Sequence, residues 1–412
     1  MNRFLKDKIF YGWIIAAAGF LIAFVGLGSR LSFGVFVKSI EEVFGLSRGA
    51  TSGIFSVYML LCSVFAVLGG LVLDKYGPKK LALFLGAFTG LSMMLTSRAD
   101  AAWQIFVTYS LLLSLGTGPV FTLVNSTAAR WFDKNRGLVL GVTSSAGGLG
   151  AIVMAPFATY MITDFGWRTA FLVIGALSWL VIGGMGLLLI KDPGEIGLLP
   201  DGKSVGNAST NPSGGGTRIP NDDIPAFQAL KKSRFWFLAL VWLFLSLCIH
   251  LIFIHVAPCA VDRGVNPMNA AFILSLIGIS TLVGRVAVGK ISDIIGRRAP
   301  VVVCGILQAG SLLFLIWADH LWMFYTFAVG FGAFSGGVGA VTTVLIGDVF
   351  GMGSIGAIMG MLGVGWAIGA ALGPALAGYI FDLSGSYAAA FLAAAVASLL
   401  ATCFISLVAG KK

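Results

Sequence analysis

Four side chains that carry or can gain a positive charge interrupt long apolar stretches of the sequence: Arg30, His250, His255 and Arg285. A guanidinium group can bind a carboxylate through two parallel hydrogen bonds, and histidine exchanges a proton near neutral pH. None of the 17 Asp and Glu residues lies in the middle of an apolar stretch. These residues therefore favour recognition of an anion, with histidine available to carry a proton.

Arg285 is the strongest candidate for binding an anion. It lies eight residues before Asp293, which marks the charged end of its apolar stretch. Eight helical residues span about 12 Å, so the guanidinium would lie near the middle of a hydrocarbon layer ~30 Å thick. The alternatives are pairing with a backbone carbonyl or extension to the membrane interface, and the depth argues against the second. We therefore predict that Arg285 binds a substrate anion.

The remaining candidates each have a second interpretation. His250 and His255 lie roughly 140° apart around a helix, so both cannot face one narrow cavity, and either can instead join two helices as a neutral ring. Asn125 can bind substrate, although a contact between helices is the simpler interpretation. Arg30 can draw anions toward an outer cavity or extend to the lipid headgroups. The sequence leaves open which histidine faces a cavity.

Membrane-spanning helices must position these residues. Hydrophobic residues make up 58% of the 412 positions and charged residues only 11%, which excludes a soluble domain of this length. Apolar stretches of about 20 residues alternate with short charged loops. Twelve spans are predicted, at 11–37, 52–73, 79–97, 102–128, 137–161, 168–190, 235–258, 268–292, 299–318, 321–347, 354–381 and 386–409.

A hydrophilic segment divides the spans six and six. We predict an N-terminal six-helix half over 1–190, a cytoplasmic linker rich in Gly, Ser, Asn and Pro over 191–233, and a C-terminal half over 234–412. Of the 27 Lys and Arg residues, 20 fall in the termini, the linker and the loops on the same side, against five on the other side. Both termini are therefore expected in the cytoplasm, and this distribution argues against nucleic acid as the reason for the net charge of +10.

The two halves repeat. The segment GLVLDKYGPKK resembles GKISDIIGRR, and one constant offset in residue number relates Asp74 to Asp293 and Gly77 to Gly296. Parallel six-helix repeats joined by a linker are typical of transporters that alternate access around a site near the membrane midplane.

These loops resemble the Gly-x-x-x-Asp-x-x-Gly-basic signature of the major facilitator superfamily. A narrower resemblance is to bacterial monocarboxylate transporters and the related oxalate/formate antiporters. It rests on YGW (11–13), RWFDKNRGLVLGVTSSAGGLG (130–150), HVAPCAVDRGV (255–265), SLIGISTLVGRVAVGKISDIIGRR (275–298) and the linker start DPGEIGLLPDG. The resemblance implies an all-α membrane protein of twelve transmembrane helices in two pseudo-symmetric halves.

The resemblance also implies roles for single residues. Arg285 stands where the family has its substrate-binding arginine, and His255, in a His-x-x-Pro motif, stands where bacterial members have a cavity histidine; it therefore ranks before His250. Mammalian relatives carry an acid one turn before the arginine, and Thr281 stands there in this chain. Proton coupling through that acid is therefore not expected.

The signature loops are expected to act as a cytoplasmic gate that does not touch the substrate. Asp74 is predicted to cap a helix of the opposite half and to pair with Arg130, and Asp293 to act as its counterpart in the second half. The predicted gate residues are Asp74, Gly77, Arg130, Asp293, Gly296 and Arg297.

We expect a secondary carrier for a small monocarboxylate, such as lactate or pyruvate, with a proton carried on His255 or on the substrate bound at Arg285. The alternative is an exchanger of the oxalate/formate type; its branch adds a lysine in span 11, which this chain lacks. Enzymes within membranes need paired carboxylates, a Ser/His pair or a His/Glu metal motif in their spans. No acidic residue is found in the middle of these spans, so no enzyme activity, metal or cofactor is predicted. The expected setting is the cell inner membrane, with a monomer as the functional unit.

Overall fold

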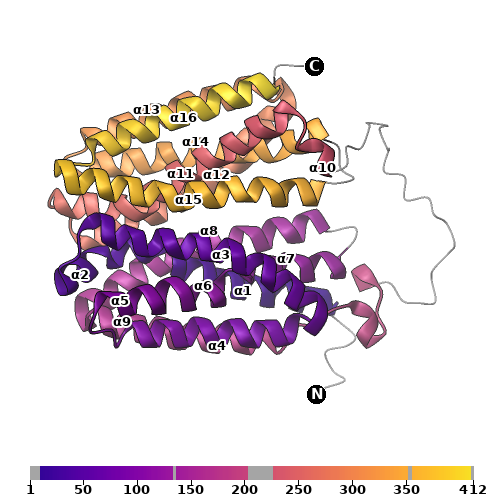
Figure 1. Ribbon diagram of the computed structural model, residues 1–412. Coiled ribbons are helices and arrows are strands. Elements are labelled where there is room, and N and C mark those ends of the chain that lie inside the picture. Colours follow the sequence, from indigo (N-terminus) through magenta and orange to yellow (C-terminus); the bar gives the residue numbers. More distant parts are fainter. Residues whose placement is uncertain (1–9, 133–135, 203–225, 351–354, 410–412) are drawn as a thin grey trace. The chain divides into compact units, whose positions relative to one another are not determined.

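The computed structural model describes residues 10–132, 136–202, 226–350 and 355–409, and helices dominate these residues (Figure 1). The chain divides by contacts into two compact units. The first unit contains Met1–Ser32 and Leu61–Gly215, and the second contains Phe33–Leu60 and Gly216–Lys412. The predicted linker thus starts in one unit and ends in the other, and residues 33–60 pack with the second unit although they belong to the first six predicted spans.

The first unit is built from long helices and two short 3-10 segments at the start of the linker. Its elements are α1 (Tyr11–Leu31), the later part of α3 (Arg48–Tyr76), α4 (Pro78–Thr96), α5 (Ala102–Ile105), the π-helical segment η2 (Phe106–Leu112), α6 (Leu113–Thr117), α7 (Val120–Trp131), α8 (Arg136–Phe165), α9 (Trp167–Gly186), η3 (Pro193–Ile196) and η4 (Pro200–Gly202).

The second unit has the same kind of architecture. Its elements are α2 (Phe33–Phe44), the start of α3, α10 (Ala226–Ala229), α11 (Ser233–Asp262), α12 (Pro267–Ile295), α13 (Arg298–Ile316), α14 (Leu321–Phe350), α15 (Ile355–Ser384) and α16 (Ala388–Ala409). Among the described residues, eleven helical stretches are long and apolar enough to cross a membrane. A further helix, α4, has 19 residues, and two lysines in its first turn make it less apolar.

The internal repeat extends to the ends of the helices. One constant shift in residue number places the bounds of α3, of the stretch 102–131 and of α8 on those of α12, α14 and α15. Glycines with positive φ recur at the same spacing, because a residue without Cβ adopts this conformation at little cost. The pairs are Gly45 and Gly264, Gly77 and Gly296, and Gly166 and Gly385, with φ between 62° and 89°. The predicted pseudo-symmetry is confirmed.

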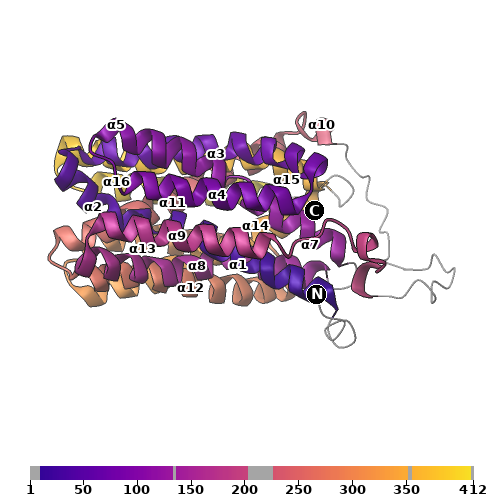
Figure 2. The same ribbon diagram turned by 90° about the horizontal axis from the view of Figure 1, so that it is seen from below.

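Equivalent helices also pack in equivalent pairs. In the first unit α1 packs on α8 and α4 on α9, which lie side by side in both views (Figure 1, Figure 2). In the second unit α11 packs on α15, α13 on α16 and α12 on α14. Small residues allow these approaches: a Cβ on Gly28 would lie 2.7 Å from the carbonyl carbon of Gly150, and one on Gly284 would overlap the carbonyl oxygen of Ala333.

Two predicted spans contain breaks that the sequence did not indicate. The first span ends as α1 at Leu31 and continues as α2 to Phe44, beyond the predicted end at residue 37. At the break the Ser32 hydroxyl donates to the Ser29 carbonyl, a local bond that competes with the helix. The fourth span contains the π-helical segment and a second break just before α7, at Pro119, which lacks a backbone donor.

Candidate functional site

Arg285 lies in the second unit on α12, ten residues before the helix ends at Ile295. Its side chain is exposed, and no described residue forms a hydrogen bond or ion pair with its guanidinium group. At 3.6 residues per turn, Arg285 projects about 160° away from Val283 and 100° away from Val286, both more than half exposed. It also points about 100° away from Gly284, which faces α14.

Arg285 therefore occupies the flank of α12 between the side that Gly284 turns toward α14 and the strip of exposed valines. Thr281, one turn earlier, lies on this flank next to α14, since a Cβ on Gly336 of α14 would overlap the Thr281 carbonyl oxygen, and the Thr281 hydroxyl donates to the Ile277 carbonyl at 2.7 Å. The flank offers a cation without a bound counter-charge among the described residues and a hydroxyl that already has its own acceptor. This arrangement is suited to binding an anion.

His255 lies on α11 with no exposed surface, and three groups surround its ring. Nε2 lies 2.9 Å from the Pro374 carbonyl and 3.1 Å from the Ser52 hydroxyl, while Nδ1 lies 3.1 Å from the Tyr387 hydroxyl. A carbonyl only accepts, so Nε2 carries the proton and Nδ1 accepts from Tyr387. No contact in the described structure links His255 to Arg285.

His250 is also buried, at 2% exposure, one turn and a half before His255. Its Nδ1 lies 2.9 Å from the Ser246 carbonyl, and its ring lies between those of Phe55 and Trp366 at centroid distances of 6.3 and 5.8 Å. The Nδ1 proton thus donates within the helix. The prediction that His255, rather than His250, lines a cavity stays a prediction.

The two candidates of the first unit lie on different helices. Asn125 on α7 accepts a hydrogen bond of 3.0 Å from the Thr143 hydroxyl on α8, as expected for a contact between helices. Arg30 lies at the end of α1, partly exposed, and its buried Nε has no hydrogen-bond partner among the described residues. Its role toward an anion stays a prediction.

The signature loops have the same backbone in both halves. Gly77 directly precedes α4 and has φ 82° and ψ 167°, and Gly296 follows α12 with φ 89° and ψ 168°. Arg130 forms an ion pair of 3.5 Å with Asp192, and Arg297 forms one of 3.5 Å with Asp348. The side chains of the predicted gate residues Asp74 and Asp293 lie outside the described part of the structure. The predicted pair of Asp74 with Arg130 stays a prediction.

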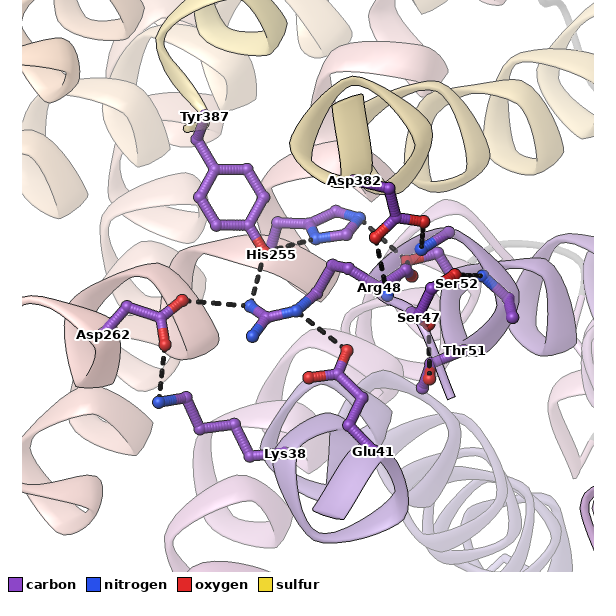
Figure 3. A network of polar contacts seen from close by, with 12 residues as sticks. Lys38, Glu41, Ser47, Arg48, Thr51, Ser52, His255, Asp262, Asp382 and Tyr387 are labelled. Carbon is purple, nitrogen blue, oxygen red and sulfur yellow. Dashed lines mark hydrogen bonds and ion pairs between the residues drawn. The ribbon is translucent and has the colours of Figure 1, made fainter. Parts of the chain in front are cut away.

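A further group of charged residues surrounds Arg48, the first residue of α3, in the second unit (Figure 3). We call it the Arg48 cluster; its members are Lys38, Glu41, Arg48, His255, Asp262, Asp382 and Tyr387. The Arg48 side chain is only 8% exposed. Its Nη1 donates to Tyr387 Oη at 2.7 Å and to Asp262 Oδ2 at 3.1 Å, and its Nε lies 2.8 Å from Glu41 Oε1. The guanidinium also stacks 4.7 Å from the Phe381 ring centre.

Backbone groups at the start of α3 belong to the same arrangement. The amides of Arg48 and Gly49 donate to the two oxygens of Asp382, at 2.9 and 2.8 Å. The next amide, of Ala50, donates to the Ser47 hydroxyl at 3.2 Å. A carboxylate is favoured at a helix N-terminus, where the first amides lack partners within the helix. Asp382 therefore caps α3 from α15, a helix that comes near the end of the chain.

Tyr387 links the two halves of the cluster. Its hydroxyl accepts from Arg48 and donates to His255 Nδ1, and the ring stacks with Phe391. Burial raises the pKa of Tyr387, an effect that the nearby Arg48 partly offsets, so the hydroxyl keeps its proton. A continuous chain of donors thus runs from Arg48 through Tyr387 and His255 to the Pro374 carbonyl.

The charged members Lys38, Glu41, Arg48, Asp262 and Asp382 were not among the candidates that the sequence indicated. The available signal was weak: Ser47 before Arg48 is a typical helix cap, and Asp262 and Asp382 each end an apolar stretch. Nothing in the sequence pairs Arg48 with Asp262 or Asp382, because these residues lie 214 and 334 positions later.

Comparison with known proteins identifies the family to which this chain is similar. The sequence profile of the Major Facilitator Superfamily matches residues 18–320 and 256–411. The chain is 27% identical over 390 residues to monocarboxylate transporter 13 of Bos taurus, covering 93% of this chain and 86% of that protein. It is 24% identical over 392 residues to monocarboxylate transporter 12 of Xenopus laevis, covering 93% and 85%.

Solved structures show the same fold. A bacterial homologue of the human lysosomal transporter Spinster, in an inward-facing and unoccupied conformation, superposes with a TM-score of 0.70 at 15% identity, covering 97% of this chain and 96% of that chain. The profile covers most of the chain, and the helical repeat has the expected spacing. These findings confirm a multi-pass membrane transporter rather than an enzyme. The chain belongs to the Major Facilitator Superfamily.

Proposed function

We propose that this protein is a secondary active transporter of a small monocarboxylate and that Arg285 binds the carboxylate. The observation that carries the proposal is the exposed guanidinium on α12, within an apolar helix and without a counter-charge among the described residues. Known relatives named as monocarboxylate transporters, similar over 93% of this chain, support the choice of substrate class.

Charge balance favours one carboxylate over two. A lone arginine in an apolar helix is stabilised when an anion arrives, since the pair can form two charge-assisted hydrogen bonds. A second carboxylate on the same substrate would need another cation close by, and no further Lys or Arg lies between residues 264 and 289 of this helix and its preceding loop except Arg285 itself. A small monocarboxylate such as lactate or pyruvate therefore fits best.

Replacing Arg285 tests this assignment. Arg285→Ala should reduce uptake by ~100-fold or more, because two hydrogen bonds to a charged group contribute about 3 kcal/mol or more. Arg285→Lys should also lose most activity, since an ammonium group cannot form the paired contact. Uptake of radiolabelled lactate and pyruvate by proteoliposomes with each purified variant measures this. Normal uptake by a well-folded Arg285→Ala variant would contradict the proposal that Arg285 binds the carboxylate.

Proton co-transport is the second part of the proposal. An anion that enters alone works against an inside-negative potential, at ~2.3 kcal/mol per charge per 100 mV. One accompanying proton makes the step electroneutral and removes this cost. We propose that the cell inner membrane is the setting and that both termini lie in the cytoplasm, as the distribution of Lys and Arg favours.

An imposed pH gradient separates symport from exchange. We expect an inward proton gradient, acid outside, to drive accumulation of labelled monocarboxylate in proteoliposomes that contain no internal anion substrate. The matched control is the same vesicles with equal pH on both sides. Uptake that ignores the gradient and requires an internal counter-anion would favour the exchanger of oxalate/formate type instead.

A further inference from the structure

The Arg48 cluster joins segments that are separated in the predicted repeat. Lys38, Glu41 and Arg48 belong to the first six spans by sequence, yet α2 and the start of α3 pack in the second unit. Their partners Asp262 and Asp382 end α11 and α15, and Tyr387 precedes α16. The cluster, drawn in Figure 3, therefore ties the first hairpin (α2 and the start of α3) to α11, α15 and the loop before α16. Asp262 lies at the end of α11 and Gly296 at the end of α12, the next helix, so the cluster and the Gly296 loop lie at opposite ends of these helices.

The contacts of the Arg48 cluster are polar and can therefore form and break reversibly. They consist of ion pairs, hydrogen bonds and a helix cap, including the pair of Lys38 with Asp262 at 2.6 Å. Polar groups of this kind exchange a protein partner for water at a small net cost. Glu41 Oε1 lies 2.8 Å from Arg48 Nε without an aligned hydrogen bond, so part of the attraction is purely ionic. Such a joint holds two segments together yet separates without exposing a large apolar core.

The backbones of α3 and α15 lie close together at the Arg48 cluster. A Cβ on Gly49 would lie 2.6 Å from Asp382 Oδ2 and 3.4 Å from the Tyr379 amide. A Cβ on Gly378 would lie 2.7 Å from the Arg48 carbonyl oxygen. The glycines allow α3 and α15 to meet so that Asp382 reaches both amides. The cap is therefore sensitive to a single added methyl group.

We propose that the Arg48 cluster is a clasp that closes this end of the transporter and must open in every transport cycle. A carrier that alternates access has to separate its two sequence halves at one end while they stay joined at the other. The clasp is the polar joint between the first hairpin and the second half at this end. Arg48 and Asp382 act as positioning residues: they hold the closed arrangement and do not bind the substrate.

A native cysteine provides a reporter for the clasp. Cys259 lies on α11 between His255 and Asp262 and is 1% exposed. Opening of the clasp would bring water and small thiol reagents to this position. The experiment uses the full chain in lipid nanodiscs with Cys62, Cys248, Cys304 and Cys403 replaced by alanine. The rate of labelling of Cys259 by a charged methanethiosulfonate reagent then measures how often the clasp opens.

Two glycines of α3 form the matched pair of variants. Gly49→Ala places a methyl group against Asp382 and should raise the labelling rate about tenfold, equivalent to ~1.4 kcal/mol. Gly53→Ala makes the same change one turn later, where no atom lies within 4 Å, and should leave the rate within a factor of two. No increase in Gly49→Ala would overturn the proposal, and so would an equal increase in both variants.

Two variants that each remove one negative charge provide an independent test. Asp382→Asn keeps the shape of the cap but removes its charge, and the labelling rate should rise severalfold. The control is Asp100→Asn, which removes an 85% exposed partner of Arg168 and should have no effect. A second reporter chain keeps only Cys248, which is fully buried on the same helix and donates to the Ala394 carbonyl.

Cys248 distinguishes opening of the clasp from general loosening. With the clasp variants, labelling of Cys248 should stay slow while labelling of Cys259 rises. A parallel increase at both cysteines would show a loosened helix bundle and overturn the proposal. The assay contains no substrate, so its result does not depend on which anion the protein carries or on the role of Arg285.

Discussion

Arg48 and Arg285 have opposite electrostatic surroundings. Arg48 is buried among two carboxylates, a phenol and an aromatic face, and each of these groups compensates for water that the guanidinium has lost. Arg285 is exposed on its helix and has no such partner among the described residues. A saturated arginine holds structure together, whereas an unsaturated one has binding capacity left. This contrast supports the different tasks that are proposed for the two residues.

His255 shows how the surroundings of a residue allow a clean substitution. A glutamine at this position can donate from its amide nitrogen to the Pro374 carbonyl and accept from Tyr387 with its oxygen, as the neutral ring does. It cannot titrate in the physiological range. His255→Gln therefore preserves the contacts with Pro374 and Tyr387 and removes the ring that is proposed to carry a proton.

We expect His255→Gln to weaken the dependence of uptake on external pH and to leave exchange of labelled for unlabelled substrate at least partly intact. Initial rates between pH 5.5 and 8 in proteoliposomes would measure this. The control is His255→Ala, which leaves the Tyr387 hydroxyl and the Pro374 carbonyl without these partners and should reduce exchange as well. A glutamine variant with the wild-type pH profile would contradict a proton-carrying role for His255.

Single residues were predictable only in part. Arg285 could be identified because a charge inside an apolar stretch is visible in the sequence. Arg48 could not, because it lies at the edge of its span and resembles an ordinary loop cation. Its partner Asp382 lies 334 residues later, and its partner Tyr387 lies 339 residues later. Local sequence carries no information about such pairings.

Glycines set how closely the helices approach each other. On α12, a Cβ at Gly284 would overlap the backbone of Ala333 on α14, whereas a Cβ at Gly289 would meet no atom within 4 Å. The two glycines thus offer the same substitution in two different environments. One tests packing between α12 and α14, and the other tests helix propensity alone.

Gly284→Ala should destabilise the protein by about 1–3 kcal/mol, because an added carbon in a packed interface forces the helices apart. Gly289→Ala should be neutral or slightly stabilising, since alanine favours the helix by up to about 1 kcal/mol. Thermal denaturation of the purified variants in detergent measures the difference. Equal denaturation midpoints for the two variants would show that the approach of α12 to α14 contributes little to stability.

The helices themselves were more predictable than their interruptions. The span predicted at 52–73 appears as α3 at residues 48–76, since apolar length and the signature loop both mark it. The break at Ser32 was missed because hydropathy gives no sign of the local hydrogen bond from Ser32 to Ser29 or of the distant contacts that follow it. Just after it, α2 approaches α11 so closely that a Cβ on Gly34 would lie 2.6 Å from the Phe253 carbonyl oxygen. Hydropathy cannot reveal a close approach of this kind.

At the level of the whole molecule, one helix connects the proposed clasp with the signature loop. Arg48 begins α3, a helix of 29 residues, and Asp74 lies close to its other end. At 1.5 Å per residue the two positions are about 40 Å apart, the approximate thickness of a membrane with its headgroups. A substitution at Asp74 therefore acts far from the Arg48 cluster and on the opposite side of the bilayer.

We expect Asp74→Asn to change the balance between conformations more than it changes substrate affinity. Labelling of single cysteines introduced on each side of the membrane should shift, while the apparent Kd for substrate stays within about a factor of three, well under the tenfold that about 1.4 kcal/mol would produce. Lys75→Gln, on the neighbouring residue, is the control for a general change of loop charge. An unchanged labelling pattern together with lost affinity would contradict a gating role.

The constant shift that relates the two halves has a consequence for charge. The backbone bounds of α3 and α12 coincide under this shift, but Ala66 stands where the second half has Arg285, and Pro267 stands where the first half has Arg48. A carrier assembled from two copies of the second half would hold two such guanidinium groups, a number suited to a substrate with two negative ends. In this chain only the second half carries an arginine at this position. The fold is a doubled scaffold, and under the proposed role of Arg285 its single guanidinium group suits a substrate with one negative charge.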